Sequence, residues 1–252
     1  MTHGTEAPAV CGGGLDGADR RKLRSMLSPV IADINEIRRA IALLFVPGDV
    51  VEVRILKTSA GVVSGYFDDH EAFATAIESA DGKYRATGVY YVLNPINPAL
   101  LGRAYNRLKE RADYTTADNN ITHRRWLPVD LDPVRPAGVS SSDHEHFSAV
   151  ARAQEIADDM AREWGRPILA DSGNGAHLLY SIDLANSEES LRFVTNALAE
   201  LDRRYSDEIV KVDVTSANAA RIWKAYGTVA RKGDSIPARP HRRAKLLEVP
   251  ND

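Results

Sequence analysis

The sequence predicts an α+β domain in which a mostly antiparallel, curved sheet is flanked by helices. Runs with apolar residues at alternate positions, the pattern of strands, are separated by stretches with apolar residues every three or four positions, the pattern of amphipathic helices. The residues that could carry chemistry all lie on predicted strands or at strand ends. Asn174-Gly175, between two apolar runs, is a strong signal for a β-hairpin.

Three segments are expected along the chain. Residues 1–18, which include three consecutive glycines, are predicted to be a disordered tail. Residues 19–46 form an N-terminal helical segment, because apolar residues from Leu23 to Leu44 recur at spacings of four and three. Ser28 before Pro29 is predicted to cap the second of two helices there. Packing of this segment on its own domain is favoured over self-association, and residues 47–252 are expected to form the catalytic domain as two packed α/β lobes.

The first part of that domain is predicted to alternate strands and a helix. Paired strands are expected at 50–67, a helix near 69–79 and a strand at 89–93. A later helix is predicted from Ser187, burying Leu191, Val194, Leu198 and Leu201 on one face.

A helix beginning at Ser142 is predicted from a capping box, in which Ser142 and Glu145 each bind the backbone of the other. Its predicted buried stripe consists of Phe147, Val150, Ala153, Ala157, Met160, Ala161 and Trp164. His144 and His146 resemble metal ligands beside two acids, but they fall in the first turn and are predicted to be solvated.

Asp130 and Asp132 stand one residue apart in the apolar strand 126–133. Because strand side chains alternate between faces, both carboxylates are expected to project opposite the buried Leu127, Val129 and Leu131, with their Cβ atoms roughly 6–7 Å apart. Two like charges held on a rigid element repel, and a divalent cation relieves that repulsion. The pair therefore suggests phosphoryl transfer, although the same triplet also fits an ordinary strand end before a turn.

The segment 167–180 predicts strand, turn and strand. If Asn174-Gly175 forms a two-residue loop, Ser172 lies opposite His177, so that a hydroxyl and an imidazole share one face. Two side-chain donors beside the approachable backbone of Gly173 and Gly175 would suit a phosphate. The alternative is a plain hairpin turn with a partly exposed histidine.

A third acid, Asp213, stands in the alternating run 210–215 and is expected on a strand next to the first two. A basic strip follows it, since Asp234 is the single acid between Arg221 and Lys245. Such a strip could hold a triphosphate or a nucleic-acid backbone.

In order and spacing, these motifs resemble the archaeo-eukaryotic primase superfamily, and within it the primase-polymerases of phages, plasmids and mobile elements. The resemblance rests on Asp130-x-Asp132, the Ser-Gly-x-Gly-x-His run of 172–177 and Asp213, and it extends over roughly 50–248. It also includes Asn94-Pro95, Arg103 to Asn106, Gly227-Thr228, Lys232-Gly233 and Arg239 to Arg242. Many relatives carry a zinc-binding module or a fused helicase, and these 252 residues contain neither.

The resemblance implies template-directed nucleotidyl transfer, as a DNA primase or DNA polymerase, on single-stranded or primed DNA. Asp130, Asp132 and Asp213 would be catalytic and would bind two Mg²⁺ or Mn²⁺ ions, with nucleoside triphosphates as substrates. The residues expected to bind the nucleotide are Ser172, Gly173, Asn174, Gly175, His177, Arg221 and Lys232. The residues expected to contact nucleic acid are Tyr105, Asn106, Lys224, Arg231, Arg239 and Arg242.

The composition limits the possible cellular location and chemistry of the protein. The net charge of −3 does not by itself suggest nucleic-acid binding, and Cys11, the single cysteine, excludes a disulfide within the chain and fits a reducing cytoplasm. Neither a membrane-spanning run, nor a signal peptide, nor a phosphate-binding loop of the ATPase type is present. The partners that the resemblance implies are template, primer, nucleotide and a separate helicase, with a monomer favoured.

Two other classes of function stay open. A metal-dependent nuclease or another nucleotidyltransferase would also use clustered carboxylates with two metals. A non-catalytic replication or defence protein could keep the same residues to sense a nucleotide.

Overall fold

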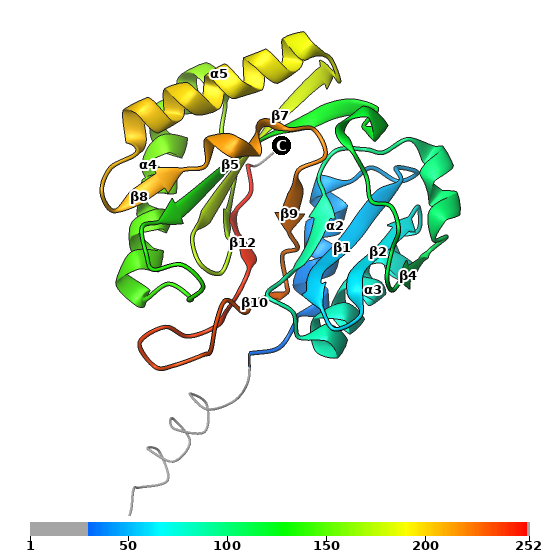
Figure 1. The fold of residues 1–252 in the computed structure, drawn as a ribbon. Helices are drawn as coiled ribbons and strands as arrows, with labels where there is room; N and C mark the ends of the chain where they lie inside the picture. The colour runs from blue at the N-terminus through cyan, green and yellow to red at the C-terminus, as the bar shows by residue number, and fades with distance from the viewer. Residues whose placement is uncertain (1–29, 251–252) are drawn as a thin grey trace, which may run out of the picture. The chain divides into compact units, whose positions relative to one another are not determined.

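Two five-stranded sheets, with strand orders β4-β2-β1-β3-β9 and β12-β6-β7-β5-β8, form the framework of the protein (Figure 1). The structure, a computed structural model, describes residues 30–250, and those from Ile31 on belong to one unit. Every pairing between neighbouring strands of these sheets is antiparallel. The predicted α+β class is confirmed, with the strands divided between two sheets. The predicted tail 1–18 and the cap at Ser28 lie outside the described residues.

Each sheet combines strands from distant parts of the chain. The first contains β1 (Val51–Thr58), β2 (Gly61–Phe67), β3 (Val89–Val92), β4 (Arg107–Lys109) and β9 (Ile222–Lys224). The second contains β5 (His123–Pro133), β6 (Ile168–Asp171), β7 (Ala176–Ala185), β8 (Val210–Val212) and β12 (Lys245–Glu248). A small ribbon pairs β10 (Val229–Ala230) with β11 (Arg242–Arg243). Short 3-10 helices span Pro98–Arg103, Asp118–Asn120 and Val214–Ala217.

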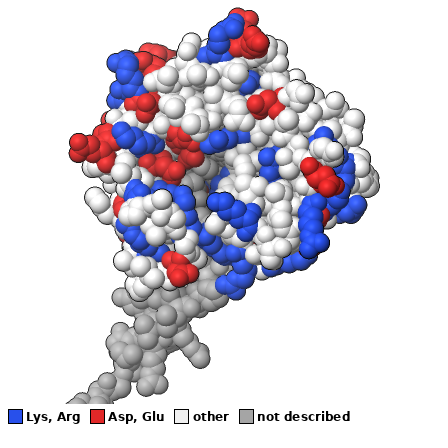
Figure 2. Space-filling view, in the orientation of Figure 1, with Lys and Arg blue, Asp and Glu red and all other residues white. Residues whose placement is uncertain are grey.

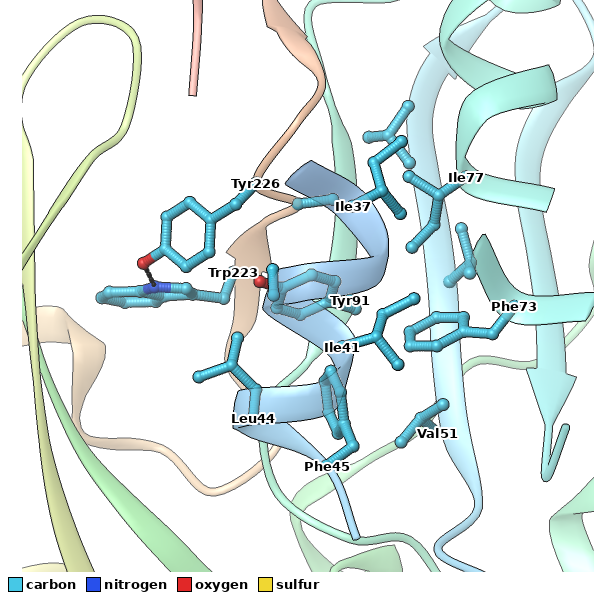
Figure 3. Packing of buried hydrophobic residues seen from close by; sticks show 14 of the residues in the cluster. Ile37, Ile41, Leu44, Phe45, Val51, Phe73, Ile77, Tyr91, Trp223 and Tyr226 are labelled. Carbon is cyan, nitrogen blue, oxygen red and sulfur yellow. Dashed lines mark hydrogen bonds between the residues drawn. The ribbon is translucent and has the colours of Figure 1, made fainter. Parts of the chain in front are cut away.

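Helices α2 (Ile34–Leu44) and α3 (His70–Tyr84) cover one face of the first sheet. Helix α2 begins at Ile34 because the Asp33 side chain accepts hydrogen bonds from the backbone N–H groups of Asn35 and Glu36. Its buried face joins an aromatic cluster in which Phe45 meets Phe73 and Tyr91 edge to face, with ring centroids 5.4 and 5.3 Å away (Figure 3). Within the described part of the predicted segment 19–46, α2 thus packs into the core of its own chain.

Helices α4 (Asp143–Trp164) and α5 (Glu188–Tyr205) cover one face of the second sheet. The predicted capping box is present at the start of α4: Ser142 N donates to Glu145 Oε2 over 2.8 Å, and Glu145 N donates to Ser142 Oγ over 3.3 Å. The predicted stripe was wrong at its first turn, because Phe147 is 65% exposed. The prediction of a solvated histidine was correct for His144 and wrong for His146, which is buried. The sheet-facing positions are His146, Ala149, Ala153, Ile156, Ala157 and Met160. In α5, Leu191 is partly exposed instead of buried.

The opposite face of the second sheet packs into the core of the first. Trp126, Ile168, Ala170, Leu179 and Leu246 belong to the same apolar cluster as α2, α3 and the first sheet. The Trp126 indole N–H also donates to the Leu44 carbonyl over 3.3 Å. The two sheets therefore share one core, and a side chain at the open end of this interface can touch both.

Asp81 of α3 joins the helix to the segment that follows β9. Its buried carboxylate accepts two hydrogen bonds from Arg231, of 2.7 and 2.8 Å, and one from Val229 N. Replacing Asp81 by Asn would leave the nearly buried Arg231 guanidinium without its counter-charge. We expect Asp81→Asn to lower the free energy of unfolding by about 3–5 kcal/mol, measured by chemical denaturation.

Glu71→Gln is the matched control, because it removes the carboxylate of the solvent-exposed Arg38–Glu71 pair. It should have a much smaller effect, since exposed ion pairs contribute little to stability. Equal losses in the two variants would contradict a structural role for Asp81.

Candidate functional site

The two acids of β5 project from the face that α4 and α5 leave uncovered. Leu127, Val129 and Leu131 belong to the helix-covered core, so the alternation predicted for this strand is present. β8 lies beside β5, with Asp132 opposite Lys211. Just past β8, the Asp213 N–H donates to the Asp130 carbonyl over 2.8 Å, which makes the third acid a cross-strand neighbour of the first.

Asp213 lies at the end of its strand instead of within it. It caps the 3-10 helix Val214–Ala217, and its carboxylate accepts hydrogen bonds from Thr215 N, Thr215 Oγ1 and Arg221 Nη2 over 2.9, 2.7 and 2.8 Å. Burial opposes ionisation of this carboxyl, but these hydrogen bonds and the Arg221 charge outweigh it and lower the Asp213 pKa.

Asp130 has the opposite electrostatic environment. Burial and the negative charges of Asp132 and Asp213 raise the Asp130 pKa well above its ordinary value. The outer acids each have a cation, since Arg135 Nη1 donates to Asp132 Oδ1 over 3.0 Å and Arg221 contacts Asp213. Among the described residues no Lys or Arg forms an ion pair with the central carboxylate, and the charges of Arg221 and Arg135 offset its environment only in part. A bound cation would relieve this repulsion.

The hairpin after β6 has a longer loop than predicted. Asp171 pairs with Ala176 and Ala170 with His177, so Ser172 does not lie opposite His177, and the predicted two-residue loop was wrong. The loop is 172–175, closed by Ser172 N donating to the Gly175 carbonyl over 3.1 Å. The register differs by an even number of residues, so His177 keeps its predicted face.

Side chains at the start of the loop explain this turn. Asp171 Oδ1 accepts from Gly173 N over 2.6 Å, and Ser172 Oγ accepts from Gly175 N over 2.9 Å, as in Asx and Ser turns. Gly173 has a φ of +91°, and a Cβ on Gly175 would collide with the Leu131 carbonyl of β5. The loop is therefore built directly against the strand that carries the acid pair.

His177 is held by a chain of hydrogen bonds behind the pocket. The Trp223 indole N–H donates to the Tyr226 hydroxyl over 3.0 Å, and that hydroxyl lies 2.9 Å from His177 Nδ1 (Figure 3 shows the Trp223–Tyr226 bond). Because the indole N–H already donates to this hydroxyl and Nε2 faces a carboxylate, we assign the tyrosine hydrogen to Nδ1 and the imidazole proton to Nε2. Nε2 lies 3.5 Å from Asp130 Oδ1, and the ring stacks on Trp223 with centroids 4.1 Å apart.

Protonation of His177 is strongly disfavoured. Burial, together with the nearby positive charge of Lys224, lowers its pKa to about 3. At neutral pH the imidazole is thus a neutral donor whose Nε2–H faces the acid pair.

A cavity of about 590 Å³ gathers most of the predicted site. Its lining includes Asp130, Asp132, Ser172, Asn174, His177, Arg221, Lys224 and Lys232. Its lining also includes side chains for which the sequence offered no signal: Lys57, Thr87, Tyr90, Arg135 and Trp223. Acidic side chains lie between Lys and Arg side chains near the middle of the face in Figure 2. The pocket therefore lies between the two sheets, at β5 and β7 on one side and β3 and β9 on the other.

Most residues expected to contact nucleic acid have other partners. Arg231 pairs with Asp81, Arg239 with Glu145 and Arg242 with Asp143, while Lys224 is buried. Asn106 accepts hydrogen bonds from the backbone of Asp68 and Asp69, which fixes the loop after β2. Tyr105 is exposed, and neither Tyr105 nor Asn106 lines the pocket.

The donor set is compatible with a hard divalent cation, because carboxylate oxygens are the ligands that Mg²⁺ and Mn²⁺ prefer and the raised Asp130 pKa marks a need for positive charge. Within residues 30–250, however, no group of three or more His, Cys, Asp or Glu side chains is close enough to hold a metal as it stands. Asp213 would have to turn from Arg221 toward Asp130 for all three acids to share an ion.

Lys224 provides a test of the pocket's electrostatics. Its Nζ donates to Thr228 Oγ1 and to the Val229 carbonyl over 2.6 and 3.0 Å, and burial lowers its pKa from 10.5 to about 7. Between these two values the unfolded chain binds a proton that the folded chain does not, so this group makes the free energy of unfolding rise with pH.

Lys224→Met should remove up to about 1.4 kcal/mol per pH unit from that rise, measured by denaturant titration from neutral to alkaline pH. Other titrating groups contribute to both proteins, so the difference between them isolates Lys224. Parallel pH profiles for the two proteins would show that Lys224 is charged in the fold.

Comparisons with known proteins found a similarity in structure and none in sequence. No family model matches the sequence. No curated protein matches it either. A solved structure described as the crystal structure of primase RepB′ superposes with a TM-score of 0.46 and 13% sequence identity, covering 85% of this chain. The chain spans 56% of the length of that structure. No helix within the described residues has the length and apolar character needed to cross a membrane.

Proposed function

We propose that this protein is a template-directed nucleotidyl transferase, a DNA primase or DNA polymerase that joins nucleotides on a single-stranded or primed template. The observation that carries this proposal is the convergence on one pocket of Asp130, Asp132, a neutral histidine donor and the cations Arg221 and Lys232. Carboxylates on one wall and phosphate-binding donors on the others suit a nucleoside triphosphate and its metal ions.

Asp130, Asp132 and Asp213 would hold Mg²⁺ or Mn²⁺. When bound, these ions would lower the pKa of an attacking 3′-hydroxyl and offset charge on the leaving pyrophosphate. The rigidity of β5 and its pairing with β8 keep the backbone positions of all three acids fixed relative to one another. Arg221 would exchange its contact with Asp213 for a phosphate oxygen, which frees that carboxylate for the metal.

His177 and its neighbours would orient the triphosphate. A neutral Nε2–H donates a hydrogen bond without adding a charge that competes with the metal ions. Ser172, Asn174 and Lys232 line the same cavity, and Lys232 supplies a cation at its rim. The amides of Gly173 and Gly175 donate within their own loop, so the glycines serve chiefly to let the loop pack against β5.

Asp130→Asn tests the metal site without an activity assay. Because its folded-state pKa is raised, Asp130 costs stability at neutral pH. That cost shrinks as the pH falls from the folded pKa and is absent below the ordinary pKa of 3.8. The variant should therefore melt at a higher temperature than the wild type in chelator. Mg²⁺ or Mn²⁺ should raise the melting temperature of the wild type and have a smaller effect on the variant. Metal stabilisation of equal size in both would contradict ion binding at Asp130.

Primer extension and unprimed synthesis with Mg²⁺ or Mn²⁺ test the reaction itself. Asp130→Ala/Asp132→Ala should reduce product at least about a thousandfold, because metal-based charge stabilisation contributes several kcal/mol. Asp158→Ala/Glu163→Ala removes two exposed carboxylates of α4 and should leave synthesis unchanged. Metal-dependent loss of the template without synthesis would point instead to a nuclease, and nucleotide binding without turnover would point to a non-catalytic sensor.

A further inference from the structure

A second set of basic residues lies outside the strip that follows Asp213. Lys57, Arg85, Arg107 and Arg111 are exposed, and none of them forms an ion pair with another described residue. By contrast, Arg231, Arg239, Arg242 and Arg243 of the strip are all paired with acids. Lys232 and Lys245 of the strip stay exposed and outside these ion pairs, but its four paired arginines are less available to an outside polyanion. The four basic residues at the first sheet therefore form a second group of available cations.

Lys57, Arg85 and Arg111 lie near the end of the first sheet where β1 turns into β2, and Arg107 lies further along the edge strand β4. Lys57, near the end of β1, lines the pocket together with Thr87, and Arg85 lies two residues before Thr87 as the C-cap of α3. Arg111 N donates to the Ala60 carbonyl in the β1–β2 turn over 3.0 Å, and Arg107 begins the edge strand β4. Figure 2 shows Lys and Arg side chains gathered on this side of the molecule, over β1, β2 and β4.

The backbone of this edge carries an unusual conformation. Lys57, Arg85 and Arg111 have φ values of +56°, +44° and +49° in the left-handed region, where L-residues other than Asn and Asp are uncommon. Glycine would adopt this conformation without the steric cost of a Cβ. Basic side chains at three such positions on one surface therefore indicate that their positive charge has a function.

Two exposed tyrosines flank the same edge strand. Tyr105 is 65% exposed and Tyr114 is 73% exposed, and they precede and follow β4 in the chain. The Arg103 guanidinium lies 5.8 Å from the centre of the Tyr114 ring. Unpaired cations beside exposed aromatic rings are the combination that binds single strands, whose phosphates meet the cations while unpaired bases stack on the rings.

We propose that single-stranded DNA crosses this edge of the first sheet along Lys57, Arg85, Arg111 and Arg107, with bases against Tyr105 and Tyr114. The strand enters the pocket past Lys57. This assignment rests on the proposed function and deepens it, because it names the path of the template and separates it from the nucleotide contacts at His177 and Arg221.

The test measures binding of a fluorescent single-stranded oligonucleotide by anisotropy at several salt concentrations. It uses full-length protein carrying Asp130→Ala/Asp132→Ala, so that no synthesis occurs. Adding Lys57→Gln/Arg85→Gln/Arg107→Gln/Arg111→Gln should weaken binding at least about tenfold. It should also reduce the slope of log affinity against log salt by about 3, since each lost phosphate contact on a single strand contributes about 0.7. Tyr105→Ser/Tyr114→Ser should weaken binding at least about thirtyfold, because two stacked bases contribute about 2 kcal/mol or more, with little change in slope.

The matched control is Arg162→Gln/Arg166→Gln/Arg192→Gln/Arg203→Gln, which removes the same charge from exposed positions around α4 and α5. It should leave affinity and slope near those of the parent. Equal weakening by both quadruple variants, or unchanged binding by the first, would overturn the assigned path. An acidic peptide that displaces the oligonucleotide at equal charge concentration would also overturn it, since the site would then be a protein-docking surface.

Failure of the path and failure of the proposed function are distinguishable. If the wild type synthesises no DNA but the basic variant loses single-strand binding, the surface is correct and the function is wrong. If the wild type extends primers and the basic variant binds and extends as well as the wild type, the function is correct and the template runs elsewhere.

Discussion

The alternation of side chains along β5 is the constraint on which the rest of the structure depends. Helices α4 and α5 seal one face of the strand through Leu127, Val129 and Leu131, so Asp130 and Asp132 must project from the other. β7 and β8 pair with β5 on its two sides and bring His177 and Asp213 beside Asp130. β5 thus contributes apolar side chains to the core beneath α4 and α5 and acidic side chains to the pocket.

The sequence predicted the structure correctly where the spacing of apolar residues agrees with the pattern of buried side chains. The acid pair, its face and its pairing with the strand before Asp213 follow from a two-residue period. The hairpin loop departed from prediction because Asp171 and Ser172 bind the backbone of their own loop, a local competition that a dipeptide signal does not contain. His146 and Phe147 exchanged places for a related reason, since the first turn of α4 is oriented by its cap and not by its largest apolar residue.

The remaining features depend on contacts between residues far apart in the chain. Tyr226 fixes the His177 tautomer from a position in the basic strip, where its neighbours suggested only charge. Arg231 is neutralised by Asp81 and Arg239 by Glu145, and no pattern along the chain shows which acid will meet which arginine. A basic surface inferred from composition alone therefore includes side chains whose charges are paired with acids in the folded protein.

The path of the chain between the two sheets has a consequence for how the protein is made. The chain leaves the second sheet after β8, adds β9 to the first sheet opposite Tyr91, and returns to the second sheet as β12 (Figure 1). The wall of the pocket at Trp223 thus depends on pairing between strands separated by more than half of the chain. Such contacts form late, because a long loop must close before they contribute. The pocket therefore cannot be complete until β9 has been synthesised and has paired with β3.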